Sequence, residues 1–202
     1  MRTDPALQPW RVAVAAAARR AGHPDAPGAA FGSSSRLHYH HRTDTIHIDR
    51  GFAARWVPTS PQAMYLIVHE LKHRITDEHH ARIFARALCT PGPLLALGAT
   101  LVAAAFWVAL ANALLAVPTI GCLFLTYACM FHAAQPARFE LEFTADDYAT
   151  DTLGLTGATI LTDIAEDTGF VAWATGHPSG AARLARQRQR GHGTEPNEES
   201  LP

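Results

Sequence analysis

The spacing of the apolar residues changes several times along this chain, and each change predicts a different element. Residues 5–22 place Ala, Val and Trp at helical intervals behind Asp4, a residue type that caps helix N-termini. Residues 23–35 are rich in Pro, Gly and Ser and predict a loop. Residues 37–40 and 45–49 alternate apolar and polar positions with a period of two, so we expect a β-hairpin or a pair of edge strands there.

Helices are expected over most of the remaining polar sequence. The predicted segments are residues 60–75, 77–89, 137–153, 157–167 and 177–190. The first begins with Ser60 as N-cap and Pro61 in its first turn, and it is apolar nearly all round, so it should be buried. Residues 187–202 are expected to be a polar disordered tail.

Residues 87–137 contain no Lys, Arg, Asp or Glu, and they form two apolar stretches. The first stretch, residues 94–116, has 23 residues, enough to span about 30 Å of hydrocarbon at about 1.5 Å per residue. The second, residues 119–134, is shorter, and Val117-Pro118-Thr119 separates the two. We expect a transmembrane hairpin with two spans at about residues 94–134. The alternative is a buried pair of helices in a soluble core.

Charge and composition narrow the class of protein. The formal net charge is −1, which gives no electrostatic reason to expect nucleic-acid binding. Three cysteines beside apolar sequence indicate small buried or lipid-facing residues rather than a disulfide framework. Basic residues flank the apolar region on both sides, and the turn inside it has none. The positive-inside rule therefore places both ends of the hairpin in the cytoplasm, in a multi-pass protein of the cell membrane.

The segment His69-Glu70-Leu71-Lys72-His73 carries the strongest chemical signal. Two histidines four residues apart lie on one face of a helix and can each give a ring nitrogen to one Zn²⁺. Glu70 can take the proton of a metal-bound water and serve as general base. Burial of these polar groups without partners would be costly, which favours a metal site over two solvated histidines.

A catalytic zinc site of this kind needs a third protein ligand. Glu142 is the best candidate, and Asp146 lies one helical turn further on the same face, where it can accept the free ring N–H of a ligand histidine. Glu140 and Asp147 are the alternatives, on other faces of the same predicted helix. We expect one Zn²⁺ per chain.

The order of these motifs resembles a known family. HELKH, an apolar hairpin and then the E-x-x-A-D of residues 142–146 are similar to the membrane zinc metallopeptidases of the HtpX and CAAX-prenyl-protease type, which are gluzincins. His177-Pro178 with Arg183 resembles the C-terminal His-Pro motif of that family, and residues 36–186 are covered. The membrane gluzincins of β-lactam-sensor type share H-E-x-x-H but usually have several preceding membrane helices.

The resemblance implies a role for each of these residues. His69, His73 and Glu142 would hold zinc, and Glu70 would act as general base and then as acid to the leaving amine. His177 or Arg183 would stabilise the oxyanion, or would have a structural role. An extended peptide would add a strand to an exposed edge at residues 45–49, contacting Thr45, Ile46, His47 and Ile48.

Four histidines form a local cluster in the two predicted strands and the turn between them, and they admit two interpretations. They are His38, His40, His41 and His47. A second metal site is one interpretation, and solvated or substrate-facing side chains on an exposed strand are the other.

Together these features predict an α+β protein, mainly helical with a small β-sheet, whose gluzincin-type core is interrupted by a transmembrane hairpin. Residues 1–35 would form an N-terminal helix and loop, and residues 36–186 the metallopeptidase domain. The expected activity is zinc-dependent hydrolysis of peptide or protein substrates at a lipid bilayer, with the active site facing the cytoplasm. Two alternatives are a catalytically inactive membrane regulatory protein with the same architecture, and a soluble gluzincin.

Overall fold

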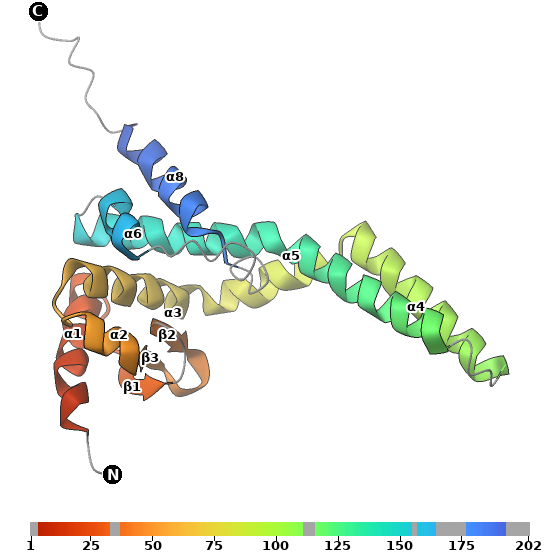
Figure 1. Cartoon of the computed structure of the whole chain (residues 1–202), viewed down its shortest axis with the longest axis horizontal. Coiled ribbons are helices and arrows are strands. Elements are labelled where there is room, and N and C mark those ends of the chain that lie inside the picture. The colour runs from red at the N-terminus through yellow and green to blue at the C-terminus, as the bar shows by residue number, and fades with distance from the viewer. Residues whose placement is uncertain (1–3, 33–36, 111–115, 155–156, 165–176, 193–202) are drawn as a thin grey trace, which may run out of the picture. The chain divides into compact units, whose positions relative to one another are not determined.

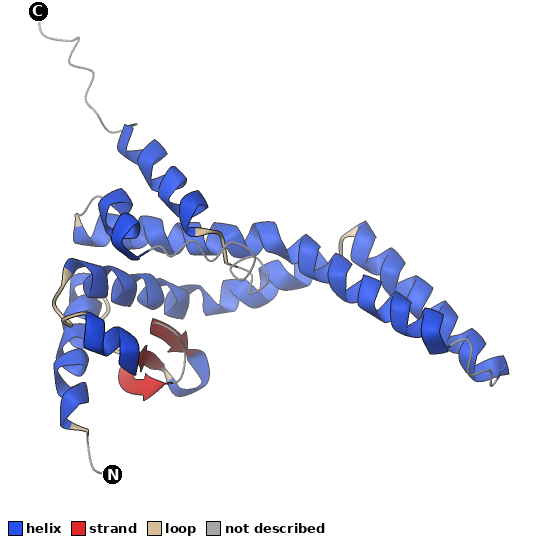
Figure 2. Ribbon diagram, viewed as in Figure 1, coloured by secondary structure: helices blue, strands red, loops and turns tan. Residues whose placement is uncertain are grey.

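The chain is mostly helical and carries one small sheet (Figure 2). The computed structural model describes residues 4–32, 37–110, 116–154, 157–164 and 177–192. This confirms the expected α+β class. The chain divides into two compact units, one formed by Met1–Asp77 with Leu141–Pro202 and the other by Glu78–Glu140.

The first unit begins with a short 3-10 helix, η1 (Pro5–Leu7), followed by α1 (Gln8–Arg20). The backbone N–H of Ala6 donates to Asp4 Oδ1 at 3.1 Å, which confirms Asp4 as the cap. Trp10, Val14 and Ala17 on one face of α1 are buried. They lie in the same hydrophobic core as the sheet residues Ile46 and Ile48.

The sheet has three strands, β1 (Gly28–Gly32), β2 (Leu37–His40) and β3 (Thr45–Asp49), in the order β1-β3-β2. The antiparallel β2–β3 pair, joined through η2 (His41–Thr43), confirms the expected hairpin. β1 was not predicted, because its sequence GAAFG lies among Pro, Gly and Ser residues that are typical of loops. β1 pairs with β3 in parallel, so β3 is the central strand and the prediction that it is an exposed edge is wrong.

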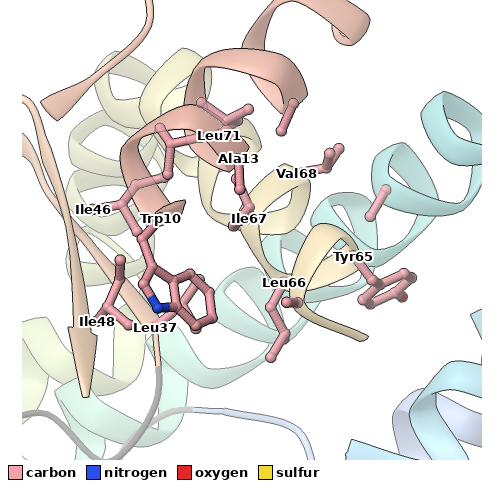
Figure 3. Close-up of a cluster of buried hydrophobic side chains, with 14 of the residues drawn as sticks. Trp10, Ala13, Leu37, Ile46, Ile48, Tyr65, Leu66, Ile67, Val68 and Leu71 are labelled. Atoms are coloured by element: carbon pink, nitrogen blue, oxygen red, sulfur yellow. The ribbon is translucent and has the colours of Figure 1, made fainter. Parts of the chain in front are cut away.

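After α2 (Arg50–Arg55), the chain enters one long helix, α3 (Pro61–Leu88). The Ala63 N–H donates to Ser60 Oγ at 3.2 Å, as expected of an N-cap. The two helices predicted at 60–75 and 77–89 are therefore one, because no Gly or Pro interrupts the sequence between them. The first turns of α3 are buried against α1 and the sheet (Figure 3), where the largest core side chains include Tyr65, Ile67 and Leu71.

Two further helices close the first unit. They are α6 (Gly157–Ile164) and α8 (Gly180–His192), which contact one another (Figure 1). α8 starts behind Ser179, whose Oγ accepts the Ala182 N–H at 3.2 Å. It begins three residues later than predicted because His177-Pro178-Ser179 precedes the cap. The disordered tail predicted at 187–202 begins too early, because residues 187–192 belong to α8 and Gln187 is buried. Residues 193–202 lie outside the described part of the chain.

The second unit contains α4 (Pro91–Leu110) and the first part of α5 (Ala116–Leu153). α5 runs through both Pro118 and Pro136, so the break predicted at 117–119 falls inside its first turn, where proline is tolerated. The helix predicted separately at 137–153 is the continuation of α5.

In α4 and the facing part of α5, polar side chains lie between the helices and apolar side chains lie on the surface, the reverse of a helical pair in a soluble protein. Thr100 and Thr126 are buried between the helices, with their hydroxyl oxygens 2.7 Å apart, and Thr126 also donates to the Ala96 carbonyl oxygen. The large apolar side chains point outward instead. They are Leu94, Leu95, Leu97, Leu101, Val102, Phe106, Trp107, Val108, Ile120, Leu123, Phe124, Leu125 and Tyr127.

Among the described helices, Pro91–Val108 in α4 is long and apolar enough to cross a membrane. Its mean hydropathy is 1.7, and only 17% of the segment is buried. The core helix of a soluble protein is mostly buried, unlike this segment. One such helix is weak evidence for a membrane span.

Candidate metal centre

The HELKH segment lies in the middle of α3, where the helix passes from the hydrophobic core to the polar part of the first unit. His69 is 3% exposed and Glu70 9% exposed, so both side chains are held inside the protein. His69 and His73, one helical turn apart, direct their Nε2 atoms toward each other at 3.1 Å. His69, Glu70 and His73 offer ligand atoms that all lie within 4.8 Å of one another.

Glu142 comes from α5 and completes the group. Its Oε2 lies 3.3 Å from His69 Nε2, and its Oε1 lies 3.4 Å from His73 Nε2. In a tetrahedral zinc site with bonds of about 2.0–2.1 Å, neighbouring ligand atoms are about 3.3–3.4 Å apart. The three side chains therefore already have the mutual spacing of zinc ligands. Two imidazoles and a carboxylate also match the ligand types of catalytic zinc sites.

Asp146 lies one turn beyond Glu142 on α5 and contacts the other side of the His69 ring. Its Oδ1 is 2.9 Å from His69 Nδ1, which leaves Nε2 to face Glu142 and His73. Arg183 from α8 donates to the same carboxylate through Nε at 2.7 Å and through Nη2. A carboxylate in this position fixes the tautomer and the orientation of a ligand histidine.

The charges in this group reinforce one another. Burial disfavours the charged form of His69, yet the hydrogen bonds to Asp146 and Glu142 raise its pKa to about 10. Burial also acts on the two carboxylates. At Glu142, burial alone would raise the pKa, but His177 and His69 hold the pKa well below its usual range. At Asp146, burial alone would also raise the pKa, but Arg183 lowers it to about 2. The two carboxylates thus create a place that favours a cation at the His69 and His73 nitrogens.

Glu70 lies beside the two histidines and also contacts the sheet. Its Oε2 accepts the backbone N–H of Tyr39 in β2 at 2.8 Å. Burial raises the pKa of Glu70 to about 7, although the charge of His69 and the Tyr39 hydrogen bond oppose the shift. A carboxyl group with a pKa near neutrality can both accept and return a proton under physiological conditions.

His177 lies at the rim of the site. Its Nδ1 is 3.1 Å from Glu142 Oε1, and its side chain is 56% exposed. Arg183, the alternative candidate for the oxyanion, is instead engaged with Asp146. The structure therefore brings His177 to the ligand group at its solvent side, while Arg183 supports the group from behind.

The alternative ligands lie elsewhere. Asp147 forms ion pairs with Arg186 and Arg190 of α8, at 3.1 Å in both cases. Glu140 is exposed. The expected substrate-contacting strand is also displaced: Ile46 and Ile48 are fully buried in the core, and Thr45 and His47 lie on the outer face of a central strand. The strand beside Glu70 is β2.

Two contacts of the site carry no signal in the sequence pattern. The Tyr39 N–H is a backbone group, and nothing in the residue order shows which strand edge meets α3. Arg74, which follows His73, forms a two-fold ion pair with Asp44 in the turn before β3, with distances of 2.7 and 2.8 Å. Asp44 has a positive φ of 47°, and an Asp in a turn is the only hint of this contact.

Comparison with known proteins gives no further assignment. No protein-family model matches the chain, and neither the curated proteins nor the solved structures give a match.

Proposed function

We propose that this protein is a zinc-dependent membrane endopeptidase with His69, His73 and Glu142 as the metal ligands. The observation that carries the proposal is the spacing of 3.1, 3.3 and 3.4 Å between the two Nε2 atoms and the Glu142 carboxylate. Each distance is close to an edge of a zinc tetrahedron, and the two that reach Glu142 end on different oxygens, so the carboxylate would turn to offer one oxygen to the ion. The resemblance of HELKH and E-x-x-A-D to the HtpX and CAAX-prenyl-protease type supports the same assignment.

Each residue of the site has a proposed task. Zn²⁺, when bound, would supply a Lewis acid that polarises the scissile carbonyl and lowers the pKa of water. Glu70 takes the proton from the attacking water and later delivers it to the leaving amine, a role that suits its pKa of about 7. His177, exposed at the rim, donates a hydrogen bond to the developing oxyanion.

The peptide is proposed to bind along the outer edge of β2. Because the Tyr39 N–H points away from β3 toward Glu70, residues 37 and 39 direct their backbone polar groups to this edge. An extended peptide can pair through its own backbone with the groups of this edge that Glu70 does not occupy. This places the scissile bond beside the general base, and β2 takes the part that the sequence assigned to β3.

The apolar hairpin is proposed to anchor the enzyme in the cell membrane through two spans, α4 and the first part of α5. The outward Leu, Val and Phe side chains suit hydrocarbon, whereas the Thr100–Thr126 hydroxyl pair between the helices is satisfied internally. Basic residues flank the hairpin on both sides, which supports an active site that faces the cytoplasm.

A second candidate function has the same architecture without catalysis. A regulatory membrane protein could keep zinc as a structural ion and use the β2 edge to bind a peptide. The buried Glu70 favours the enzyme, because a protein that held zinc only as a structural ion would not need a second carboxyl group with a raised pKa beside the ligand histidines.

Hydrolysis by the wild type and by Glu70→Gln tests the enzyme. The variant keeps the hydrogen bond from Tyr39 through its amide oxygen but cannot take a proton, so we expect zinc content to persist and cleavage of a peptide library to fall at least about 100-fold. Glu140→Gln, an exposed glutamate on α5, is the matched control and should cleave normally. Equal cleavage by Glu70→Gln and wild type would refute the mechanism, and stoichiometric zinc without cleavage by either would favour the regulatory protein.

A further inference from the structure

The outer face of the sheet carries a group of imidazoles that the proposed zinc centre does not use. β2 and β3 alternate, so Leu37, Tyr39, Ile46 and Ile48 face the core while His38, His40 and His47 face away from it. His38 is paired directly with His47 across the two strands. We call His38, His40 and His47 the histidine face.

The strand register brings three imidazoles to one side of the sheet. Two residues that alternate on one strand lie on the same side, and a residue opposite the first on a neighbouring strand has its Cβ about 4.5–5.5 Å away. His38-x-His40 with His47 opposite is therefore a triangle of imidazoles on two strands. The rings of His40 and His47 are already neighbours, with their centroids 5.4 Å apart and their planes 18° apart.

One of these rings is held by a contact of the kind found around ligand histidines. His40 Nδ1 lies 3.0 Å from Thr43 Oγ1. In the tautomer in which Nδ1 donates this bond, Nε2 carries the lone pair that binds a metal. Thr43 thus plays toward His40 the orienting part that Asp146 plays toward His69.

The neighbouring strand leaves room for the second ring. A Cβ at Gly32 would come within 2.9 Å of His47 Cβ and 3.0 Å of His47 Nδ1. A larger residue at position 32 would push the His47 side chain away from its place. Glycine there keeps His47 flat against β1 and beside His40.

We propose that His38, His40 and His47 form a second metal site, for a late first-row divalent transition ion such as Zn²⁺. Imidazole-only sites suit Zn²⁺, Cu²⁺ and Ni²⁺. The stacked rings must turn toward a common point to bind, so this site binds Zn²⁺ more weakly than the centre on α3. It does not depend on the proposed hydrolysis.

Zinc titration of a chain that lacks the α3 centre tests this site directly. In His69→Ala/His73→Ala protein, stripped of metal and shown by circular dichroism to be folded, we expect one Zn²⁺ to bind per chain. Adding His40→Ala and His47→Ala removes two of three ligands and should weaken binding by at least about 100-fold. Thr43→Val keeps every imidazole and should weaken it by about 10- to 100-fold.

His132→Ala, on α5, is the matched control, and it should bind Zn²⁺ as the parent does. Unchanged affinity after loss of His40 and His47, or no binding by the folded parent, would overturn the site. If His69→Ala/His73→Ala does not fold, the full chain serves instead. Its stoichiometry should then fall from two zinc ions to one with His40→Ala/His47→Ala, and an equal stoichiometry in both would overturn the proposal. Loss of hydrolysis does not enter either readout.

Discussion

At the scale of single residues, the geometry of the proposed zinc centre depends most on Asp146. It is completely buried, it accepts from Arg183 and it lies 2.9 Å from His69 Nδ1. The Tyr65 hydroxyl also approaches its backbone oxygen, at 3.4 Å. Because Arg183 of α8 holds the Asp146 carboxylate and this carboxylate contacts His69, the position of α8 affects the orientation of the His69 ring.

Substitution Asp146→Asn should therefore affect both metal binding and folding. The amide no longer fixes the His69 ring as a charged acceptor does, so we expect zinc affinity to fall by about 10- to 100-fold. Arg183 loses its buried partner, which should lower the free energy of unfolding by about 3–5 kcal/mol. A competing chelator measures the first effect and denaturant unfolding the second.

Asp147→Asn is the control for that substitution, since Asp147 is adjacent but bonds to Arg186 and Gln187 of α8. Its more accessible ion pairs should change stability by about 1 kcal/mol or less and leave zinc affinity unchanged. Equal zinc affinities for Asp146→Asn and wild type would show that Asp146 does not orient His69.

The grouping of the candidate site residues could be predicted from the sequence because it depends on short spacings. His69 and His73 at four residues, and Glu142 and Asp146 at four residues, each lie on one helix face whatever the rest of the fold does. The Asp146–Arg183 pair spans 37 residues, so no local pattern contains it. The hydrogen bond from the Tyr39 N–H could not be predicted for a different reason: every residue except proline has a backbone N–H, so the residue type gives no signal.

At the scale of elements, two contacts one helical turn apart hold β2 and its turn against α3. Glu70 accepts the Tyr39 N–H, and Arg74 pairs with Asp44. The Tyr39 hydroxyl also donates to Asp44 Oδ1 at 2.9 Å. This clamp fixes the strand edge that we assign to the substrate beside the general base.

The Asp44–Arg74 pair should give stability a dependence on pH in the acid range. Burial raises the pKa of Asp44, but the hydrogen bonds from Arg74 and Tyr39 outweigh it and hold the pKa below 3.8. The unfolded chain then binds the proton more readily, so the pair stabilises the fold above about pH 4 and its contribution is lost as pH falls through the lowered pKa.

Denaturant unfolding of the metal-free protein between pH 7 and pH 3 measures this dependence. At pH 7 the free energy of unfolding of the wild type should exceed that of Asp44→Asn by about 1 kcal/mol or less, because the ion pair is partly exposed. The difference should shrink toward pH 3. Asp25→Asn is the control, since Asp25 meets Arg74 through its backbone carbonyl oxygen. A difference that stays constant over the whole range would contradict the assignment to Asp44.

Element boundaries were harder to predict than element types. α3 and α5 each join two predicted helices, since Asp77 and Glu78 do not end a helix and Pro136 is accommodated inside one. β1 was missed because its small residues give no alternation, and its place depends on pairing with β3. The strand order then decides which edge is exposed, and this is a property of the whole sheet.

At the scale of the whole molecule, the polar and apolar surfaces belong to different units. The unit of residues 78–140 buries Thr100, Thr119 and Thr126 and exposes large apolar side chains, the reverse of the core around Ile46 and Tyr65. Such a surface is stable in hydrocarbon and costly in water. The sequence predicts this division because the absence of charge over residues 87–137 is a composition signal that needs no tertiary information.

Membrane extraction tests the anchoring. The full chain should remain in the membrane pellet after high salt and alkaline carbonate and should be released by detergent. Arginine at the outward positions Leu97 and Leu101 should cost about 2.5–3.5 kcal/mol each and lower the membrane fraction. Val57→Arg, at an exposed position of the other unit, should not. Release of wild type by carbonate alone would favour the soluble gluzincin.

Anomalous X-ray scattering at the zinc edge, from crystals of the zinc-loaded full chain, tests the central claim most directly. The account predicts a zinc peak about 2.0–2.1 Å from Nε2 of both His69 and His73 and about 2.0–2.2 Å from a Glu142 oxygen. These distances require only small shifts of side chains that already lie 3.1 to 3.4 Å apart. Absence of a peak there, or a peak that Glu142 does not coordinate, would contradict the account.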